Sequence, residues 1–570
     1  MRAARFVGRL FEATARDPGP ACPGAEARWA AALSGGRAFR RVPVMRAPTR
    51  FLPPLLLALP ALLATAPARA DLAPIGLSEV GAQWFDNEDL VFYGPEVGDH
   101  FAAALAAGDF NGDGADDLAT GIPDDDEIGG GCTDCGMVVI RYGGEGGLAG
   151  GLATTVLHQG LAGSPRDAFE GNRFGAALAA GDFNHDLYDD LAVGVPGNGG
   201  VVQIYYGSPS GLQTDNAQVL YHYLAYFNYC DGIDFGAALA VGDFDHDLYA
   251  DLVVGAPNDC VENEEDEDIR SGVVYVAHGH ELGLVPFDGY WISQDSPGIA
   301  DEIEEGDQFG RAVAAGDFNA DTFDDLAIGV AAEGTNGAIE IVMGSEFGLI
   351  FANSVFWEPG ALGEVPEDGD RLGFSLASGD FDADGYADLA IGNPSEDLGA
   401  ANEKFDAGSI VVAYGAPAWF DLSRTQRFAQ GNVYDNAAYD QSEDQFGWAL
   451  AAGDFDGDGA DDLAVGHPRE HVLAARAGAI TVLMGAPIAG LVSRFRFVAA
   501  GLVGLPGDTQ GYQEFGHALA VGDFDGTGFA DLVIGAPLFS RDGIADVGGE
   551  MVLYGALFAD GFEIGSTQRW

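Results

Sequence analysis

The sequence predicts an all-β fold, namely a seven-bladed β-propeller with four-stranded blades. One motif, which begins GDF and ends DLAxG or DLVxG, occurs seven times, and its first copy is GDFNGDGADDLATG at 108–121. The first aspartates of successive copies are 73, 61, 74, 63, 74 and 69 residues apart. This spacing suits a four-stranded sheet with loops and is too long for a two-helix repeat. After residue 70 the sequence shows no sustained helical period.

Each copy of the motif stands in the same frame of expected strands. A run of small apolar residues precedes it, as in FGAALAAGDF from residue 174. The apolar end of the motif begins a second strand, and a β-branched run such as GGVVQIYYGSPSGL (199–212) supplies a third. A less regular segment such as ATTVLHQG (153–160) supplies a fourth. Such runs between glycine-rich turns are typical of strands.

The two ends of the repeat array predict how the ring closes. Seven open sheets must stack, and radial closure removes their exposed edges. The last repeat has its third strand at GGEMVLYGAL (548–557), but little chain follows for a fourth. We therefore expect the segment GAQWFDNEDLVFYG (81–94), which precedes the first motif, to complete the seventh blade.

The charge of the chain changes sharply near residue 70. The first 70 residues hold 11 Arg and 3 acidic residues of the 26 basic and 89 acidic in total, which leaves 15 and 86 for residues 71–570. After Met45 come two arginines, an apolar run and the small residues Ala68 and Ala70, as in a secretory signal peptide. A membrane anchor is the alternative, but the run 51–66 is short and contains prolines.

We therefore predict four segments. They are an upstream extension at 1–44 that precedes the true start, a signal peptide at 45–70, the propeller at 71–558 and a short tail at 559–570. The acidity of the exported part argues against binding of nucleic acid or an anionic membrane, because both would be repelled. We expect no membrane span in the mature chain, and a monomer.

The seven motifs predict metal-binding loops. Counted from the first aspartate, oxygen-bearing side chains fall at positions 1, 3, 5 and 9, and the backbone carbonyl of position 7 can point inward. Hard oxygen donors at this spacing suit Ca²⁺, so up to seven ions are expected. The residues in these five positions of the seven loops are Asp109, Asn111, Asp113, Ala115, Asp117; Asp182, Asn184, Asp186, Tyr188, Asp190; Asp243, Asp245, Asp247, Tyr249, Asp251; Asp317, Asn319, Asp321, Phe323, Asp325; Asp380, Asp382, Asp384, Tyr386, Asp388; Asp454, Asp456, Asp458, Ala460, Asp462; and Asp523, Asp525, Thr527, Phe529, Asp531.

Two other interpretations of these loops are an EF-hand and a plain Asx-turn. An EF-hand needs a Glu at position 12 and a following helix, but position 12 is apolar or Thr here and a strand follows. Plain Asx-turns are the structural alternative, although three carboxylates about 5 Å apart repel by roughly 3 kcal/mol per pair at an effective dielectric of 20. Position 6 is Gly in loops 1, 5, 6 and 7 but Leu187, Leu248 or Thr322 elsewhere, where a positive φ is strained. With Thr527 removing one charge, we predict the tightest sites in loops 1, 5 and 6.

The frame and the loop together resemble FG-GAP repeats, the units of the propeller at the N-terminus of integrin α subunits. The resemblance covers nearly all of 96–556. It implies that the metal loops join the first two strands of each blade on one face, while partners bind mainly the loops of the other face. It also implies departures, because integrin propellers usually carry three or four such loops and are followed by leg domains and a membrane span. Similar stand-alone repeats occur in exported bacterial proteins.

The remaining features favour structural roles. Cys230 and Cys260 flank the third loop, and a disulfide between them is expected in an exported chain. Cys132 and Cys135 could form a redox-active pair, but they precede a strand, so a small loop disulfide is favoured. The acidic run 262–268 could bind a cation or a basic partner, but a solvated loop is the commoner explanation. His185 and His246 at position 4 are expected to be exposed spacers.

The sequence thus favours a secreted or cell-surface calcium-binding propeller, made by a bacterium, that binds extracellular proteins or glycans, as in cell adhesion, without chemistry of its own. The alternatives are an enzyme that degrades polysaccharides or phospholipids on a propeller scaffold, and a structural component of the envelope or matrix. A propeller fold does not fix function, so the ligand is not identified.

Overall fold

The described part of the chain is almost entirely β-structure. The computed structural model describes residues 77–555 except 87–95, 127–131, 149–153, 162–163, 165, 223–232, 263–267, 286–288, 400–403, 435, 437–438, 473–474, 501–511 and 542–543. The chain divides into two compact units, Met1–Ala70 and Asp71–Trp570, and every described residue belongs to the second. The expected extension, signal peptide and tail lie outside the described residues.

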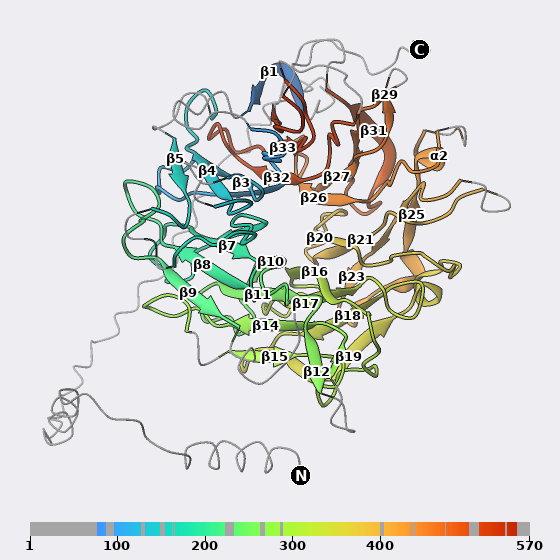
Figure 1. The fold of residues 1–570 in the computed structure, drawn as a ribbon. Helices are drawn as coiled ribbons and strands as arrows, with labels where there is room; N and C mark the ends of the chain where they lie inside the picture. Colours follow the sequence, from blue (N-terminus) through green and yellow to red (C-terminus); the bar gives the residue numbers. More distant parts are fainter. Residues whose placement is uncertain are drawn as a thin grey trace, which may run out of the picture. The chain divides into compact units, whose positions relative to one another are not determined.

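The second unit forms seven four-stranded antiparallel sheets, which confirms the predicted seven-bladed propeller (Figure 1). From the innermost strand outward, blade 1 contains β2 (Ala104–Gly108), β3 (Asp117–Ile122), β4 (Met137–Arg141) and β5 (Thr155–Leu157), and blade 2 contains β6 (Ala177–Gly181), β7 (Asp190–Val195), β8 (Val201–Tyr205) and β9 (Gln218–Tyr221). Blade 3 contains β10 (Ala238–Gly242), β11 (Asp251–Ala256), β14 (Val273–Ala277) and β15 (Tyr290–Ile292), and blade 4 contains β16 (Phe309–Gly316), β17 (Asp325–Val330), β18 (Ala338–Met343) and β19 (Ile350–Trp357).

The other three blades repeat the pattern. Blade 5 contains β20 (Ser375–Gly379), β21 (Asp388–Asn393), β22 (Ser409–Ala413) and β25 (Gln426–Phe428), and blade 6 contains β26 (Ala449–Gly453), β27 (Asp462–His467), β30 (Ala479–Met484) and β31 (Val492–Val498). Blade 7 contains β32 (Leu519–Gly522), β33 (Asp531–Gly535), β34 (Glu550–Tyr554) and β1 (Ser78–Phe85). The minor elements are β12 (Cys260–Glu262), β13 (Asp268–Arg270), β23 (Gly415–Ala416), β24 (Trp419–Phe420), β28 (His471–Val472), β29 (Ala475–Arg476), η3 (Pro359–Leu362), η4 (Leu422–Arg424) and α2 (Gln430–Val433).

Closure of the ring follows the prediction from the sequence. Strand β1 pairs antiparallel with β34, with Ser78 opposite Tyr554 and Phe85 opposite Glu550. The strand begins three residues before the expected segment, whose second half lies among the residues that are not described. The innermost strands contact one another in sequence, and β32 contacts β2. The first and last parts of the propeller are therefore joined within one sheet.

The core lies between neighbouring blades. The second strand of every blade is buried along its whole length. The phenylalanine of every GDF sequence has no exposed surface, and it packs in the cluster between its own blade and an adjacent one. The glycine that ends each motif allows the blades to approach, since a Cβ on Gly121 would lie 2.1 Å from the Gly175 carbonyl oxygen of the next blade. The motif thus sets the blade packing as well as the loop.

Candidate metal centres

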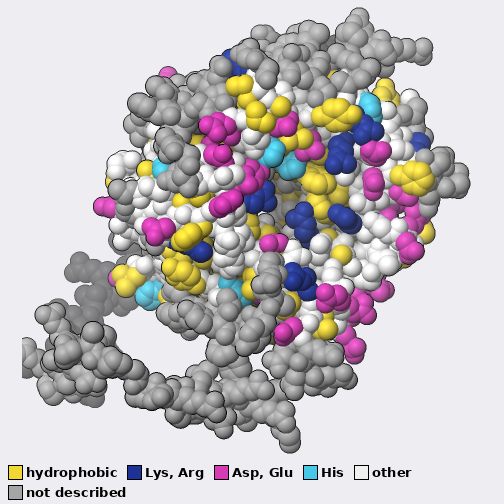
Figure 2. Space-filling model, in the orientation of Figure 1, with side chains coloured by type: hydrophobic (Ala, Val, Ile, Leu, Met, Phe, Trp, Pro, Cys, Tyr) yellow, Lys and Arg dark blue, Asp and Glu magenta, His cyan; other side chains and the backbone are white. Residues whose placement is uncertain are grey.

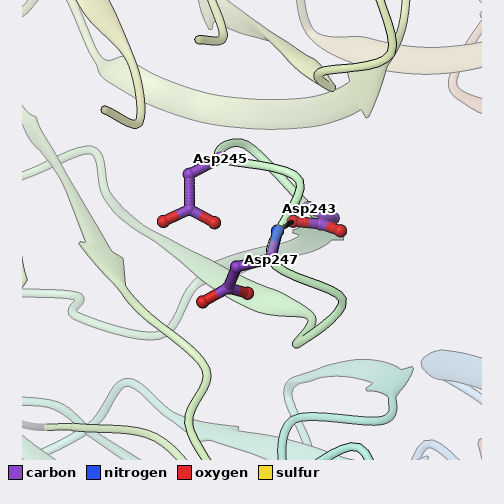
Figure 3. A group of neighbouring side chains, drawn as sticks. All are labelled: Asp243, Asp245 and Asp247. Carbon is purple, nitrogen blue, oxygen red and sulfur yellow. Dashed lines mark hydrogen bonds between the residues drawn. The ribbon is translucent and has the colours of Figure 1, made fainter. Parts of the chain in front are cut away.

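The seven acidic loops occupy equivalent places in the propeller. Each loop joins the innermost strand of a blade to its second strand, as the resemblance implied, and position 9 is the first residue of that second strand. In the third loop, Asp243, Asp245 and Asp247 extend from a tight turn after β10 (Figure 3). Because the loop closes a two-stranded hairpin, its side chains converge over a short stretch of backbone.

Position 1 organises the turn in every loop. In the first loop, Asp109 Oδ1 accepts a hydrogen bond from the Asp113 N–H at 3.1 Å, and Oδ2 accepts one from the Gly114 N–H at 2.9 Å. The corresponding pairs are present in the other six loops. In six loops the carboxylate of position 5 also accepts the N–H of position 7, and Thr527 replaces that carboxylate in the seventh. The loops are therefore Asx-type turns.

Position 9 ties each loop to the third strand of its blade. All seven aspartates at this position are at most 1% exposed. Asp117 Oδ1 accepts the Gly143 N–H at 2.9 Å, just after β4, and Oδ2 accepts the Phe110 N–H at 3.1 Å. The third loop differs, because Asp251 accepts the Gly279 N–H at 2.9 Å and also lies 3.4 Å from Nδ1 of His278. A hydrogen-bonded turn thus buries one carboxylate per loop.

The structure brings three carboxylates together in four of the loops. Their oxygens lie within 4.8 Å of one another, and such groups can hold a metal ion; they are Asp243, Asp245, Asp247; Asp380, Asp382, Asp388; Asp454, Asp456, Asp462; and Asp523, Asp525, Asp531. Loops 1, 2 and 4 have Asn at position 3 instead. There the amide nitrogens of Asn111 and Asn319, rather than the expected oxygens, point to the position 9 carboxylate, at 3.3 Å and 3.2 Å. An N–H donor at this place compensates the buried negative charge.

The carboxylate oxygens that accept no hydrogen bond within the turn suit a hard cation. One carboxylate oxygen of each of Asp245, Asp251 and Asp382 is buried and accepts no hydrogen bond from the described residues. Burial raises the pKa of Asp388 to about 8, and the nearby charge of Asp382 adds to this effect. Five other position 9 carboxyls show pKa values raised by burial in the same way. A buried carboxylate with like-charged neighbours needs either a proton or a cation, and all-oxygen donors suit calcium or magnesium.

The backbone at position 6 is left-handed in the loops that lack glycine there. Leu187, Leu248 and Thr322 have φ of 73°, 75° and 81°, as the sequence led us to expect. This conformation costs a non-glycine residue about 1–2 kcal/mol. His185 and His246 at position 4 are exposed, as predicted, but their rings also contact Tyr249 and Phe323 of the following blade at 5.7 Å and 6.0 Å between centroids.

The loops are also linked to one another in a closed ring, which the sequence analysis did not anticipate. The N–H of position 8 donates to the carbonyl of position 1 in the preceding blade, as from Asp189 to Asp109 at 3.1 Å. All seven junctions have this bond, including the one from Asp116 in blade 1 to Asp523 in blade 7 at 2.9 Å. At four junctions the position 8 side chain is Asp and accepts the position 1 N–H as well. A change in one loop is thus felt at the junction with the next blade.

The fifth loop contains an additional cation from the protein itself. Arg424, at the end of η4, donates a hydrogen bond to the carboxylate of Asp382, and its Nη1 lies 4.0 Å from an oxygen of Asp384. Asp382 is 1% exposed, and the guanidinium also lies over the Tyr414 ring at 4.5 Å. This contact could not be predicted from the motif, because Arg424 stands outside it. Its charge competes with any metal ion bound in this loop.

Replacing this arginine is therefore expected to strengthen metal binding in the fifth loop. In Arg424→Gln, one calcium site should gain about fivefold to tenfold in affinity, because a competing charge is removed from two of its carboxylates. Calorimetric titration with calcium measures the change. Arg427→Gln is the matched control, since Arg427 instead pairs with Glu364 at 2.9 Å, and its isotherm should match that of the wild type. Identical isotherms for all three proteins would contradict the assigned competition.

A pH dependence follows from the buried carboxyls of position 9. The pKa of Asp388 in the folded protein is about 8, above its ordinary value of 3.8. Protonation of this carboxyl therefore stabilises the metal-free protein at low pH. This contribution is lost as the pH rises through about 8. In the presence of chelator we expect the thermal midpoint to be more than about 5 °C higher at pH 5 than at pH 8. Calorimetric scans in chelator at several pH values measure this midpoint. A metal-free protein that becomes more stable between pH 5 and pH 8 would contradict the prediction.

Cys132, Cys135 and Cys260 lie in connections between second and third strands, away from the acidic loops. Cys132 and Cys135 form a close disulfide pair with Cα atoms 5.9 Å apart, and both are nearly buried. Cys260 is disulfide-bonded, but its predicted partner Cys230 lies outside the described residues. Most of the acidic run 262–268 also lies outside them. Among the described residues no helix is long and apolar enough to cross a membrane.

The fold and the loops define a class of protein, a β-propeller in which every blade carries an acidic loop between its first two strands. The FG-GAP repeat family matches residues 174–206, 235–266, 309–339, 372–412, 446–483 and 515–549. Six of the seven blades, blades 2 to 7, therefore contain a matched FG-GAP repeat, in agreement with the resemblance seen in the sequence. The matched ranges omit blade 1, in which Ala102 stands where most other copies have the glycine of the Phe-Gly pair.

Comparison with known proteins finds two groups of relatives. Bovine (Bos taurus) phosphatidylinositol-glycan-specific phospholipase D is 24% identical over 423 residues, which is 61% of this chain and 48% of that protein. Integrin alpha-PS2 of Drosophila melanogaster is 38% identical over 173 residues, 29% of this chain and 12% of the integrin. Integrin alpha-5 of Xenopus laevis is 30% identical over 237 residues, 41% and 20% of the two chains. The chain therefore spans about half or less of these relatives, which include a named enzyme and non-enzymes.

Proposed function

We propose that this protein is an exported calcium-binding propeller that binds extracellular proteins or glycans and performs no reaction. The observation that carries the proposal is the ring of seven loops, each of which buries a carboxylate and four of which gather three carboxylates within 4.8 Å. Calcium would be held by the side chains of positions 1, 3, 5 and 9 and the carbonyl of position 7. It would supply charge compensation that keeps the turns and the junctions between blades in shape.

The placement of the loops supports different roles for the two faces of the propeller. The acidic loops occupy one end of every blade and are engaged with one another. The connections between second and third strands, and from fourth strands to the next blade, lie at the other end and vary in length and sequence. Recognition loops on a rigid scaffold are the usual place for binding residues. The likeness to integrin alpha subunits supports a binding role, and the cleavage signal near Ala70 supports export.

Arrays of glycans and of extracellular proteins test this proposal. The calcium-loaded protein is expected to bind a subset of spots, and chelator should abolish the binding. Asp388→Asn combined with Asp462→Asn should weaken it at limiting calcium, whereas Asp215→Asn, an exposed residue outside the loops, should not. The absence of binding on both arrays, together with cleavage of a polysaccharide or of a phosphatidylinositol-glycan substrate, would overturn the proposal in favour of an enzyme. Mass spectrometry of the exported protein tests for a mature start at Asp71.

A further inference from the structure

A cavity lies on the propeller axis at the end opposite the acidic loops. It measures about 260 Å³ and is lined by residues at the start of all seven innermost strands. Its wall consists mainly of one alanine–leucine pair, or a close equivalent, from each strand. This volume is below the roughly 300–1,000 Å³ of pockets for drug-sized ligands. The cavity therefore suits one small group.

Arg311 is the only charged side chain among the described residues that line this cavity. Its register position in β16 is the residue after the Phe-Gly pair, where blades 1, 2 and 3 have Ala103, Ala176 and Ala237. The guanidinium lies over the ring of Phe374 from blade 5, 4.2 Å from its centroid. It forms no ion pair or hydrogen bond through its side chain with any described residue. In a chain with 89 acidic and 26 basic residues, a cation without an acidic partner among the described residues is unusual.

The described residues that contact Arg311 or shift its pKa add positive charge and aromatic surface. Burial lowers the pKa of Arg311, and the nearby Arg371 lowers it further. Phe374 in turn contacts Trp448, with ring centroids 4.7 Å apart, and Trp448 contacts His517 at 5.5 Å. In the face drawn in Figure 2, basic side chains lie around the central hollow, with hydrophobic and acidic side chains near them. The rim thus offers a cationic spot on a strongly acidic molecule.

We propose that this axial cavity binds a small carboxylate carried on an apolar body, with Arg311 as the partner of the carboxylate. A guanidinium binds a carboxylate through two parallel hydrogen bonds, and a partly buried one without a partner gains most from such a ligand. The alanine, leucine and valine side chains of the wall can contact an apolar body, and Arg311 lies among them. This inference rests on the proposed binding function and gives it one site and one ligand chemistry.

The test uses the full calcium-loaded chain and 3-phenylpropionate as the probe, followed by calorimetry or ligand-observed NMR. We expect saturable binding to the wild type. It should weaken by at least about tenfold in Arg311→Met and less in Arg311→Lys. Ala177→Leu should also weaken it, because it fills the cavity without removing the charge. Arg173→Met is the matched control, since Arg173 is already paired with Asp124 at 2.8 Å, and its affinity should equal that of the wild type.

Further arms identify the source of the carboxylate. A tripeptide that ends in a free C-terminal Phe is compared with its amide, and binding of the free acid alone assigns a peptide C-terminus; binding of only 3-phenylpropionate assigns a free acid. Tighter binding of galacturonate than of 3-phenylpropionate would contradict the assignment of an apolar body to the ligand. No saturable binding by the wild type, or equal affinity in Arg311→Met, overturns the site. If array binding persists in that case, the proposed function stands while this inference fails.

Discussion

Removal of calcium is expected to lower the thermal midpoint of the protein by at least about 10 °C. A site filled at a hundred times its dissociation constant stabilises the folded state by about 2.7 kcal/mol, and several loops would lose their ion together. The effect is not confined to each turn, because the N–H of position 8 in one loop donates to position 1 of the preceding blade around the whole ring. Differential scanning calorimetry with calcium and with a chelator measures it.

Two controls separate this effect from a general action of the chelator. Excess calcium added after chelation should restore the midpoint. Asp388→Asn, which changes a fully buried loop residue, should reduce the difference between the two conditions, whereas the exposed Asp215→Asn should leave it unchanged. An unchanged thermal midpoint in chelator would indicate that the seven loops are ordinary Asx-turns, held by the hydrogen bonds of position 1 alone.

Replacement of Glu550 is expected to destabilise the closed ring by about 3–5 kcal/mol. This residue of β34 accepts a hydrogen bond from Nη1 of Arg141 at 2.6 Å and another from the Thr120 hydroxyl at 2.8 Å. It has no exposed surface, and Arg141 is 4% exposed, so the pair joins blade 7 to blade 1 in the interior. Glu550→Gln leaves a buried guanidinium without its counter-charge. Denaturant unfolding in saturating calcium gives the free-energy change.

The same substitution at an exposed ion pair serves as the control, because it removes a charge without leaving a buried partner. Glu443 forms an ion pair of the same length, 2.6 Å, with Arg476, but both side chains are substantially exposed. Exposed pairs contribute about 0–1 kcal/mol, so Glu443→Gln should change the free energy of unfolding by less than about 1 kcal/mol. Equal effects of the two substitutions would show that the junction between blades 7 and 1 does not depend on the buried pair.

The blade architecture could be predicted because its signals are local and repeated seven times. The strand periodicity, the glycine that ends each motif and the alternating oxygens at positions 1, 3 and 5 all lie within 14 residues. Strand β1 could be placed in blade 7 because a strand-like segment precedes the first motif and belongs to no repeat of its own. These arguments need no knowledge of distant contacts.

The parts that could not be predicted depend on residues brought together from different blades or from outside the motif. Arg424 reaches Asp382 from a short turn 42 residues later. The position 8 links form only once neighbouring loops lie side by side, and four copies have Asp at position 8, the first Asp of the sequence DDL. The contact of Arg311 with Phe374 of blade 5 likewise follows from packing at the axis, because the sequence shows only an arginine where other copies have alanine or an aromatic residue.

Counting the calcium ions bound per chain tests the central claim most directly. Equilibrium dialysis of the chelator-stripped full chain against calcium, with bound metal measured by atomic emission, gives this number. The proposal predicts several ions per chain, up to seven, and a lower number when the position 1 and position 9 aspartates of one loop are replaced by asparagine. A chain that retains less than one ion at saturating calcium, or a count unaffected by these replacements, would contradict the assignment of the loops as metal sites.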